Sequence, residues 1–145
     1  MHHAFRLLHV LSMATWLAAS LWLASDARRS LSAGPDEARA FLVRARAALR
    51  LDRLAGLATI VTGLALLHFA HAWPPRGGLW LGMGLAVVRA GLNDAVLSPG
   101  VKGLAAGLEA GQAPATLLPV ARRLALASGA GHLAWLGAVA GMLLR

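Results

Sequence analysis

The sequence predicts an all-α fold, a four-transmembrane-helix bundle whose second helix is extended into the cytoplasm. Apolar stretches long enough to cross a bilayer predict the spans, because a hydrocarbon core about 30 Å thick needs about 20 apolar residues of helix. Each stretch is expected to be helical, since backbone groups in lipid must be hydrogen-bonded within the segment. The expected spans leave room for a single integral membrane domain, residues 1–145, and lie at 4–25, 54–72, 78–97 and 123–144.

Composition excludes several classes of protein. Hydrophobic residues make up 58% of the chain and charged residues only 14%, whereas a soluble domain is about half apolar and about a quarter charged. The chain has no cysteine, so disulfides, iron–sulfur clusters and thiolate metal sites are excluded. We expect no nucleic-acid partner despite the net charge of +8, because the basic residues cluster in the connections between spans.

The distribution of basic residues predicts the orientation. Ten of the fourteen Lys and Arg lie in or flank residues 26–53 and 98–122, and cytoplasmic loops collect such residues. We therefore expect a multi-pass protein of a bacterial-type inner membrane, with these two loops cytoplasmic and both termini outside. A cleaved secretory signal over residues 1–25 is the rival interpretation, but it would leave the basic first loop outside.

The first two helices are expected to be separated by a turn. The first span is predicted to end at residues 25–26, and residues 32–35 form a turn that precedes the second helix. Pro35 suits a first helical position, and the two acidic residues after it suit the positive end of the helix dipole. Without a helix breaker before Trp73, the second helix should run from Pro35 to Ala72, with its first half outside the membrane.

The second half of the chain is expected to contain one long loop. Residues 98–100, Ser-Pro-Gly, are predicted to end the third helix, and a loop containing Pro114 and Pro119 leads to the fourth. Glycines on the spans allow close helix packing, either inside the bundle or in a homodimer or larger membrane complex. They are Gly56, Gly63, Gly78, Gly82, Gly137 and Gly141.

Polar residues inside the spans are the candidates for function, because they are costly in lipid. They are His9, His68, His71, Arg89, Asn93, Asp94 and His132.

His9 and His68 are expected at one depth near the outer surface, on neighbouring antiparallel helices. Two neutral imidazoles in this arrangement suit the axial ligands of haem or a site for Cu or Zn. His132 and His71 are the alternative second ligands. Met13 and Trp16 share the helix face of His9 and are expected to contact the bound group. Arg6 and Arg76 lie at the outer end, where haem propionates need cations.

Arg89 needs a partner inside the membrane because it does not lose its proton. Asn93 on the same helix, Asp94, or a polar group of another helix are the candidates. The arrangement would serve either to hold the bundle together or to bind an anionic substrate in a wet cavity.

Several short motifs carry a family resemblance. Residues 8–11 (LHVL) and 14–19 (ATWLAA), the TG dipeptide at 62–63, Trp80-Leu81, and Asn93 followed by Pro99 resemble the CopD/HemJ-like membrane proteins, closest to their uncharacterised members. The resemblance implies a four-helix bundle in the inner membrane and, for HemJ-like members, b-type haem at His9. Ala18-Ala19 stands where the family usually has Gly after the Trp, and Arg89 where HemJ-like proteins tend to place Lys.

The sequence thus predicts an inner-membrane protein that binds haem b for electron transfer or redox chemistry. If it is an enzyme, it is a haem-dependent membrane oxidoreductase. Copper handling is one alternative, and a structural or assembly subunit without any cofactor is the other.

Overall fold

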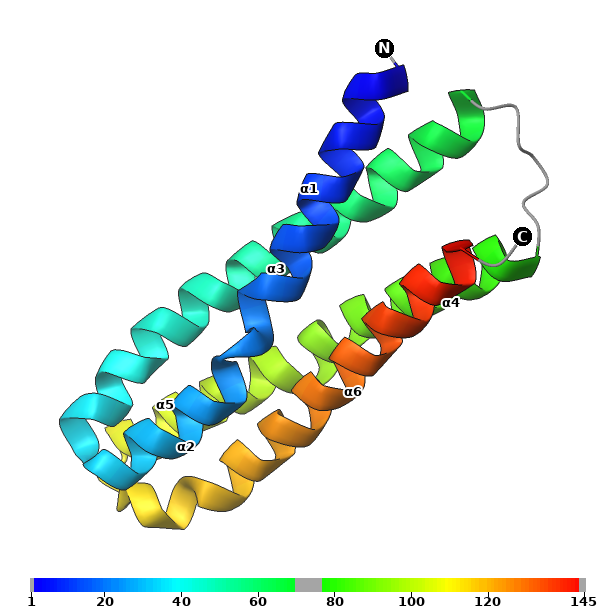
Figure 1. Ribbon diagram of the computed structural model, residues 1–145. Coiled ribbons are helices and arrows are strands. Elements are labelled where there is room, and N and C mark those ends of the chain that lie inside the picture. Colours follow the sequence, from blue (N-terminus) through cyan, green and yellow to red (C-terminus); the bar gives the residue numbers. More distant parts are fainter. Residues whose placement is uncertain (1, 70–76, 144–145) are drawn as a thin grey trace.

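The computed structural model describes residues 2–69 and 77–143, and all of its elements in these ranges are helices (Figure 1). The predicted all-α four-helix bundle is therefore confirmed. In chain order the elements are α1 (His2–Leu21), α2 (Leu23–Ala33), α3 (Pro35–Phe69), α4 (Gly77–Leu92), the π-helix η1 (Asn93–Leu97), α5 (Ser98–Glu109), the 3-10 helix η2 (Pro114–Leu117) and α6 (Leu118–Leu143).

These elements combine into four long rods. Residues 3–33, 35–69, 77–109 and 114–143 each form a helical stretch long and apolar enough to cross a membrane. The chain is therefore a multi-pass membrane protein. Each rod has 30 to 35 residues, well above the 20 or so that a bilayer core needs, so part of every rod extends beyond the hydrocarbon.

The turn between the first two rods lies where the sequence predicts it. Gly34 has a φ of 124°, a conformation that costs glycine little, and α3 begins at once with Pro35. The helical rod continues beyond residues 25–26, where the first span is predicted to end. After a turn at Trp22 the chain continues as α2 to Ala33, because α2 buries an apolar face in the bundle.

The predicted end of the third helix at residues 98–100 is wrong. The helix continues through η1 into α5, with Pro99 in the first turn of α5. Proline lacks an N–H and its ring meets the carbonyl four residues earlier. The wider π-turn directly before Pro99 accommodates both defects without ending the rod. The fourth helix likewise begins earlier than predicted, at Leu118 rather than near residue 123.

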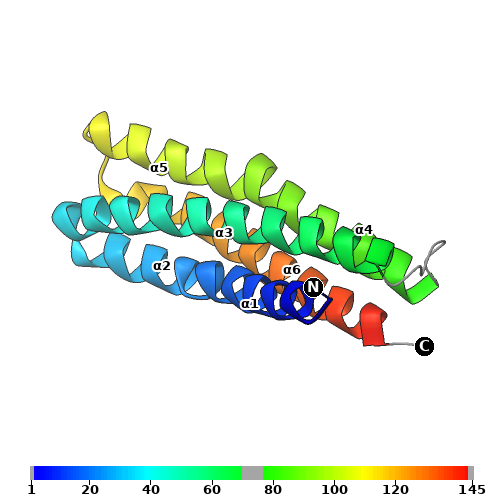
Figure 2. The same cartoon turned by 90° about the horizontal axis from the view of Figure 1, so that it is seen from above.

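The rods associate in pairs. α1 packs mainly on α3, and α4 packs mainly on α6. The two pairs diverge toward the end of the molecule that holds both termini (Figure 1). Seen from above, α3 lies between α1–α2 on one side and α4–α5 on the other (Figure 2).

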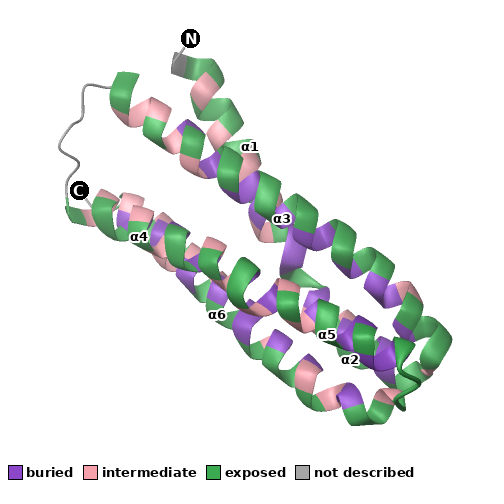
Figure 3. Ribbon diagram, turned by 180° about the vertical axis from the view of Figure 1, so that it is seen from behind, coloured by how far each residue is buried: buried purple, intermediate pink, exposed green. Residues whose placement is uncertain are grey.

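Along its length the bundle divides into two halves with opposite surfaces. We call residues 2–21, 52–69, 77–92 and 128–143 the apolar half, and residues 22–51 and 93–127 the charged half. In the apolar half the exposed positions are largely leucine and valine, among them Leu8, Leu57 and Leu133. In the charged half many exposed positions are arginine, such as Arg46 and Arg50. Exposed and buried residues alternate along every helix in both halves (Figure 3).

The charged half has the interior of a soluble helical bundle. A continuous apolar core joins α2, α3, α5 and α6 around Leu23, Phe41, Leu104 and Leu124. Polar contacts support it at the surface: Arg44 of α3 binds Asp26 of α2 and Glu37 near the start of α3. These hydrogen bonds, that to Asp26 foremost, raise the pKa of Arg44 above its usual value.

The glycine faces are used inside the bundle. A Cβ on Gly141 would lie 2.8 Å from the carbonyl oxygen of Gly78, and one on Gly82 would lie 2.9 Å from that of Ala138. The backbones of α4 and α6 therefore approach each other as closely as small residues permit. On α3, Gly56 and Gly63 lie against the rings of α1 residues in the same way.

Candidate functional site

The divergence of the two helix pairs opens a cleft in the apolar half, and His9 of α1 lies in it. A cavity of about 400 Å³ and a smaller one of about 60 Å³ lie next to each other here. Both are lined by His9, Gly63, Met83 and Met142, so all four rods contribute. We call the combined space the His9 cleft. Its size falls within the range of small-molecule and cofactor sites.

A hydrogen bond holds the imidazole of His9 against Thr62 of α3. The Oγ1 of Thr62 donates its single hydrogen to the carbonyl oxygen of Ala58 at 2.6 Å. The same Oγ1 lies 2.9 Å from Nδ1 of His9; in the tautomer with the proton on Nδ1, the hydroxyl oxygen accepts this hydrogen bond. Nε2 then keeps its lone pair. An imidazole held by its other nitrogen in this way is the usual form of a histidine metal ligand.

The remaining polar and sulfur groups of the cleft are few. The thioethers of Met83 on α4 and Met142 on α6 line it together with His9. Arg6, one turn before His9, lines the larger cavity. Gly63 is small enough to let the imidazole lie against α3, since a Cβ there would approach its Cε1 to 3.1 Å. One imidazole, two thioethers and one guanidinium are thus available to a bound group.

The structure does not bring His68 together with His9. His9 contacts Thr62 and Gly63 on α3, whereas His68 follows Gly63 by five residues. Five residues correspond to a rotation of about 140° and a rise of about 7.5 Å. The ring of His68 is exposed and packs edge-on against Phe69 at 5.6 Å. Equal depth on neighbouring helices is not enough to bring two histidines together. His68 must also lie on the face of α3 that packs against α1, and depth does not specify that face.

Other predicted ligands also lie away from the cleft. His132 on α6 follows Gly131, which lies beside Arg89, and its buried Nε2 has no hydrogen-bond partner in the described residues. Met13 is half-buried and does not line either cavity of the cleft. His71 and Arg76 lie outside the described residues.

Trp16 belongs to a second polar cluster, at the boundary between the two halves. Its side chain is 1% exposed, and its indole Nε1 donates to Asp52 at 3.2 Å. The Cζ of Arg89 lies 4.9 Å from the centre of the indole, within the range of a cation–π contact. Gly56 makes room for the ring, since a Cβ there would lie 2.8 Å from Trp16.

Asp52 of α3 is the partner that Arg89 requires. The two side chains form an ion pair at 3.0 Å with 3% and 4% of their surface exposed. The Nη2 of Arg89 also donates to the carbonyl oxygen of Trp16 at 2.7 Å and lies 3.3 Å from Oγ of Ser20. Arg89 lines none of the cavities described here. Its contacts join α1, α3 and α4, as expected of a residue that holds the bundle together.

The two polar neighbours of Arg89 on its own rod have different roles. Asn93 is buried and donates through Nδ2 to Asp52 at 2.7 Å, while its Oδ1 has no partner in the described residues. Asp94 points outward instead and forms an exposed ion pair with Arg53. The carboxylate of Asp52 therefore accepts from Trp16, Ser20, Arg89 and Asn93 together.

Asp52 was missed by the sequence reasoning because it precedes the predicted second span, among arginines. A signal was present nevertheless. Ala45, Asp52 and Thr59 recur every seven residues, which places them on one helix face, and all three are buried. An acidic residue on this buried face of α3 is the expected ion-pair partner of an arginine inside the membrane.

Within residues 2–69 and 77–143 no group of three or more His, Asp or Glu side chains is positioned to hold a metal ion. In that part of the chain, a metal in the His9 cleft would need the methionine sulfurs or a prosthetic group as further ligands. Such a ligand set, with imidazole and thioether donors in an apolar cavity, fits haem iron or a soft copper ion.

Comparison with known proteins gives no relative: no family model, no curated protein and no solved structure matches this chain.

Proposed function

We propose that this protein binds haem b in the His9 cleft and acts in electron transfer or redox chemistry at the inner membrane. The observation that carries the proposal is the hydrogen bond between Thr62 and Nδ1 of His9. In the tautomer in which Thr62 accepts this bond, Nε2 keeps its lone pair, and His9 lines the cleft. Haem iron is commonly held by one axial histidine of this kind.

The sulfur atoms of the cleft would supply a further ligand to the bound iron. Met83 and Met142 come from the helix pair opposite His9, and histidine with methionine is an established axial pair for haem. This assignment replaces His68, which lies on a different face of α3. Arg6 at the outer end supplies a cation for a propionate.

The charge distribution supports the orientation. Basic residues of the charged half, such as Arg28, Arg46 and Arg122, favour a cytoplasmic location for that half. The termini and the open end of the His9 cleft then face outside. A haem at this depth would exchange electrons with partners at the outer surface. The resemblance to the CopD/HemJ-like proteins is consistent with haem bound at His9.

Copper handling is the second candidate, and the two methionines of the cleft favour it. Thioether sulfur and imidazole are ligands that Cu(I) accepts readily. The same residues would then form a site for one copper ion instead of the faces of a porphyrin.

The decisive experiment is an absorption spectrum of the detergent-purified full chain, expressed with haem supplied, oxidised and then reduced with dithionite. We expect a Soret band that shifts on reduction. His9→Ala should abolish it, and Thr62→Val should weaken haem binding about 10–100-fold, because it removes only the partner of Nδ1. His68→Ala is the matched control and should leave the spectrum unchanged.

A protein of normal helical content without a Soret band would refute the haem proposal. Copper is then tested by competition with a chromophoric Cu(I) chelator. Binding that is lost in His9→Ala and in Met83→Leu would support the second candidate, and no measurable binding would refute it.

A further inference from the structure

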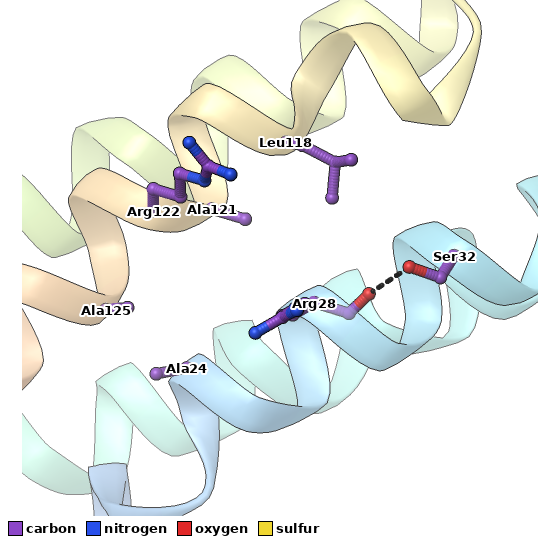
Figure 4. A pocket seen from close by; sticks show the side chains of 7 residues that line it. All are labelled: Ala24, Arg28, Ser32, Leu118, Ala121, Arg122 and Ala125. Carbon is purple, nitrogen blue, oxygen red and sulfur yellow. Dashed lines mark hydrogen bonds between the residues drawn. The ribbon is translucent and has the colours of Figure 1, made fainter.

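A groove between α2 and α6 in the charged half has the chemistry of a lipid-headgroup site. It encloses about 300 Å³, and Arg28 of α2 and Arg122 of α6 line it from opposite sides (Figure 4). Between them the lining consists mainly of small apolar side chains, with Ala24 on α2 and Ala121 and Ala125 on α6.

The two arginines carry uncompensated charge. Both are exposed, and neither forms an ion pair with a carboxylate in the described part of the chain. Asp26, the acidic residue of α2, is bonded to Arg44 instead. Ser32 at the end of the groove donates its hydroxyl hydrogen to the carbonyl oxygen of Arg28 at 3.0 Å, so the guanidinium groups are the donors available to a ligand.

The groove lies next to the exposed apolar residues at the edge of the charged half. Trp22 and Leu126 are exposed apolar residues at the edge of the charged half. Arg28 lies six residues beyond Trp22, about 9 Å along the helix, and Arg122 lies four residues beyond Leu126, about 6 Å. The headgroup layer on each side of a bilayer is about 5–8 Å thick, and arginine side chains are long enough to reach back into it.

We propose that this groove binds an anionic phospholipid, with its phosphate between Arg28 and Arg122 and one acyl chain along the alanines toward Leu126. Guanidinium groups bind phosphate oxygens in pairs of hydrogen bonds, and basic pockets between transmembrane helices bind anionic headgroups. The alanines and Leu118 give the groove an apolar lining against which an acyl chain can pack. A soluble phosphate would use the arginines but not the apolar lining.

The test is native mass spectrometry of the full chain purified in detergent and incubated with phosphatidylglycerol or with phosphatidylcholine. We expect retention of phosphatidylglycerol in preference to phosphatidylcholine. The variant Arg28→Gln/Arg122→Gln should weaken that retention by about tenfold or more, because it removes the two guanidinium groups that donate directly to the phosphate. Ala125→Leu, which keeps both charges but narrows the groove, should weaken it as well.

The matched control is Arg29→Gln/Arg123→Gln, which removes two exposed charges from the neighbouring positions of the same helices. It should retain the lipid. Equal loss in both double variants would overturn the proposal, because the attraction would then be diffuse. Equal retention of the two lipids, no effect of Ala125→Leu, or displacement of the lipid by millimolar inorganic phosphate would overturn it too, the last indicating a free-phosphate site.

Discussion

The charged half and the apolar half of this bundle are built from the same four rods but are inverted relative to each other. In the charged half, large apolar side chains such as Phe41 and Leu104 are buried and arginines are exposed. In the apolar half, leucines and valines are exposed, while the interior holds Trp16, glycine, other small residues and polar groups such as Thr59 and Asp52. The comparison teaches that surrounding solvent, not helix geometry, decides which residues lie inside.

Different forces then hold the two halves together. In water, burying apolar surface stabilises a bundle by about 25 cal/mol per Å², and the core of the charged half uses this term. Between helices in lipid that driving force is absent, and close packing and hydrogen bonds replace it. The ion pair of Asp52 and Arg89 lies at the boundary between the charged half and the apolar half.

Breaking this ion pair is expected to have the largest effect. Asp52→Asn leaves Arg89 as an uncompensated buried charge, so it should lower the free energy of unfolding by about 3–5 kcal/mol. Unfolding is measured by circular dichroism with increasing SDS in mixed micelles. The double variant Asp52→Asn/Arg89→Met should recover much of the loss, because replacing both charges of a buried pair is often neutral. A double variant as unstable as the single one would contradict this role.

Matched leucine truncations distinguish the two halves directly. Leu104 in the charged half is fully buried, whereas Leu136 in the apolar half is 55% exposed. Leu104→Ala should cost about 2–5 kcal/mol through lost burial and a cavity, and Leu136→Ala should change stability by no more than about 0.5 kcal/mol. The same titration compares them, and equal costs would mean that the halves do not differ as described.

Matched glycine substitutions test close packing in the apolar half. A methyl group on Gly141 would meet the backbone of Gly78, whereas one on Gly84 would meet nothing within 4 Å. Gly141→Ala should destabilise the α4–α6 pair by about 1–3 kcal/mol. Gly84→Ala should be neutral or stabilising, because alanine is the better helix former. If both variants keep wild-type stability in the SDS titration, close α4–α6 contact is not required.

The smallest effect is expected at the exposed ion pair beside the buried one. Asp94 pairs with Arg53, and both side chains are about 60% exposed. Asp94→Asn should cost less than about 1 kcal/mol, and added salt should reduce the difference further. A loss comparable to that of Asp52→Asn would show that depth in the bundle does not separate the two pairs.

The fold was largely predictable from the sequence because apolar length and helical continuity are local properties. The turn at Gly34 and the start of α3 at Pro35 are confirmed. The error at residues 98–100 has a local cause: Ser-Pro-Gly normally ends a helix, but the π-turn of η1 before Pro99 lets the rod continue.

The candidate site was predictable only in part. The sequence identified His9 from its depth in the first span. Its hydrogen-bond partner Thr62 is known only from the packing of α1 against α3. His68 was misplaced relative to His9, because depth alone does not specify rotation about the axis of α3. Met83 and Met142 were not recognised, since two methionines far apart in sequence carry no signal of their own.

By itself, the sequence determined that this protein crosses a membrane with four helices and where its basic segments lie. These properties follow from how each stretch interacts with lipid or water, independently of its neighbours. Only the tertiary structure decided that Asp52 neutralises Arg89, that His9 lines a cleft with two methionines and that Arg28 and Arg122 line one groove. Those pairings depend on which helix faces meet and at what height, and that is settled by the packing of all four rods together.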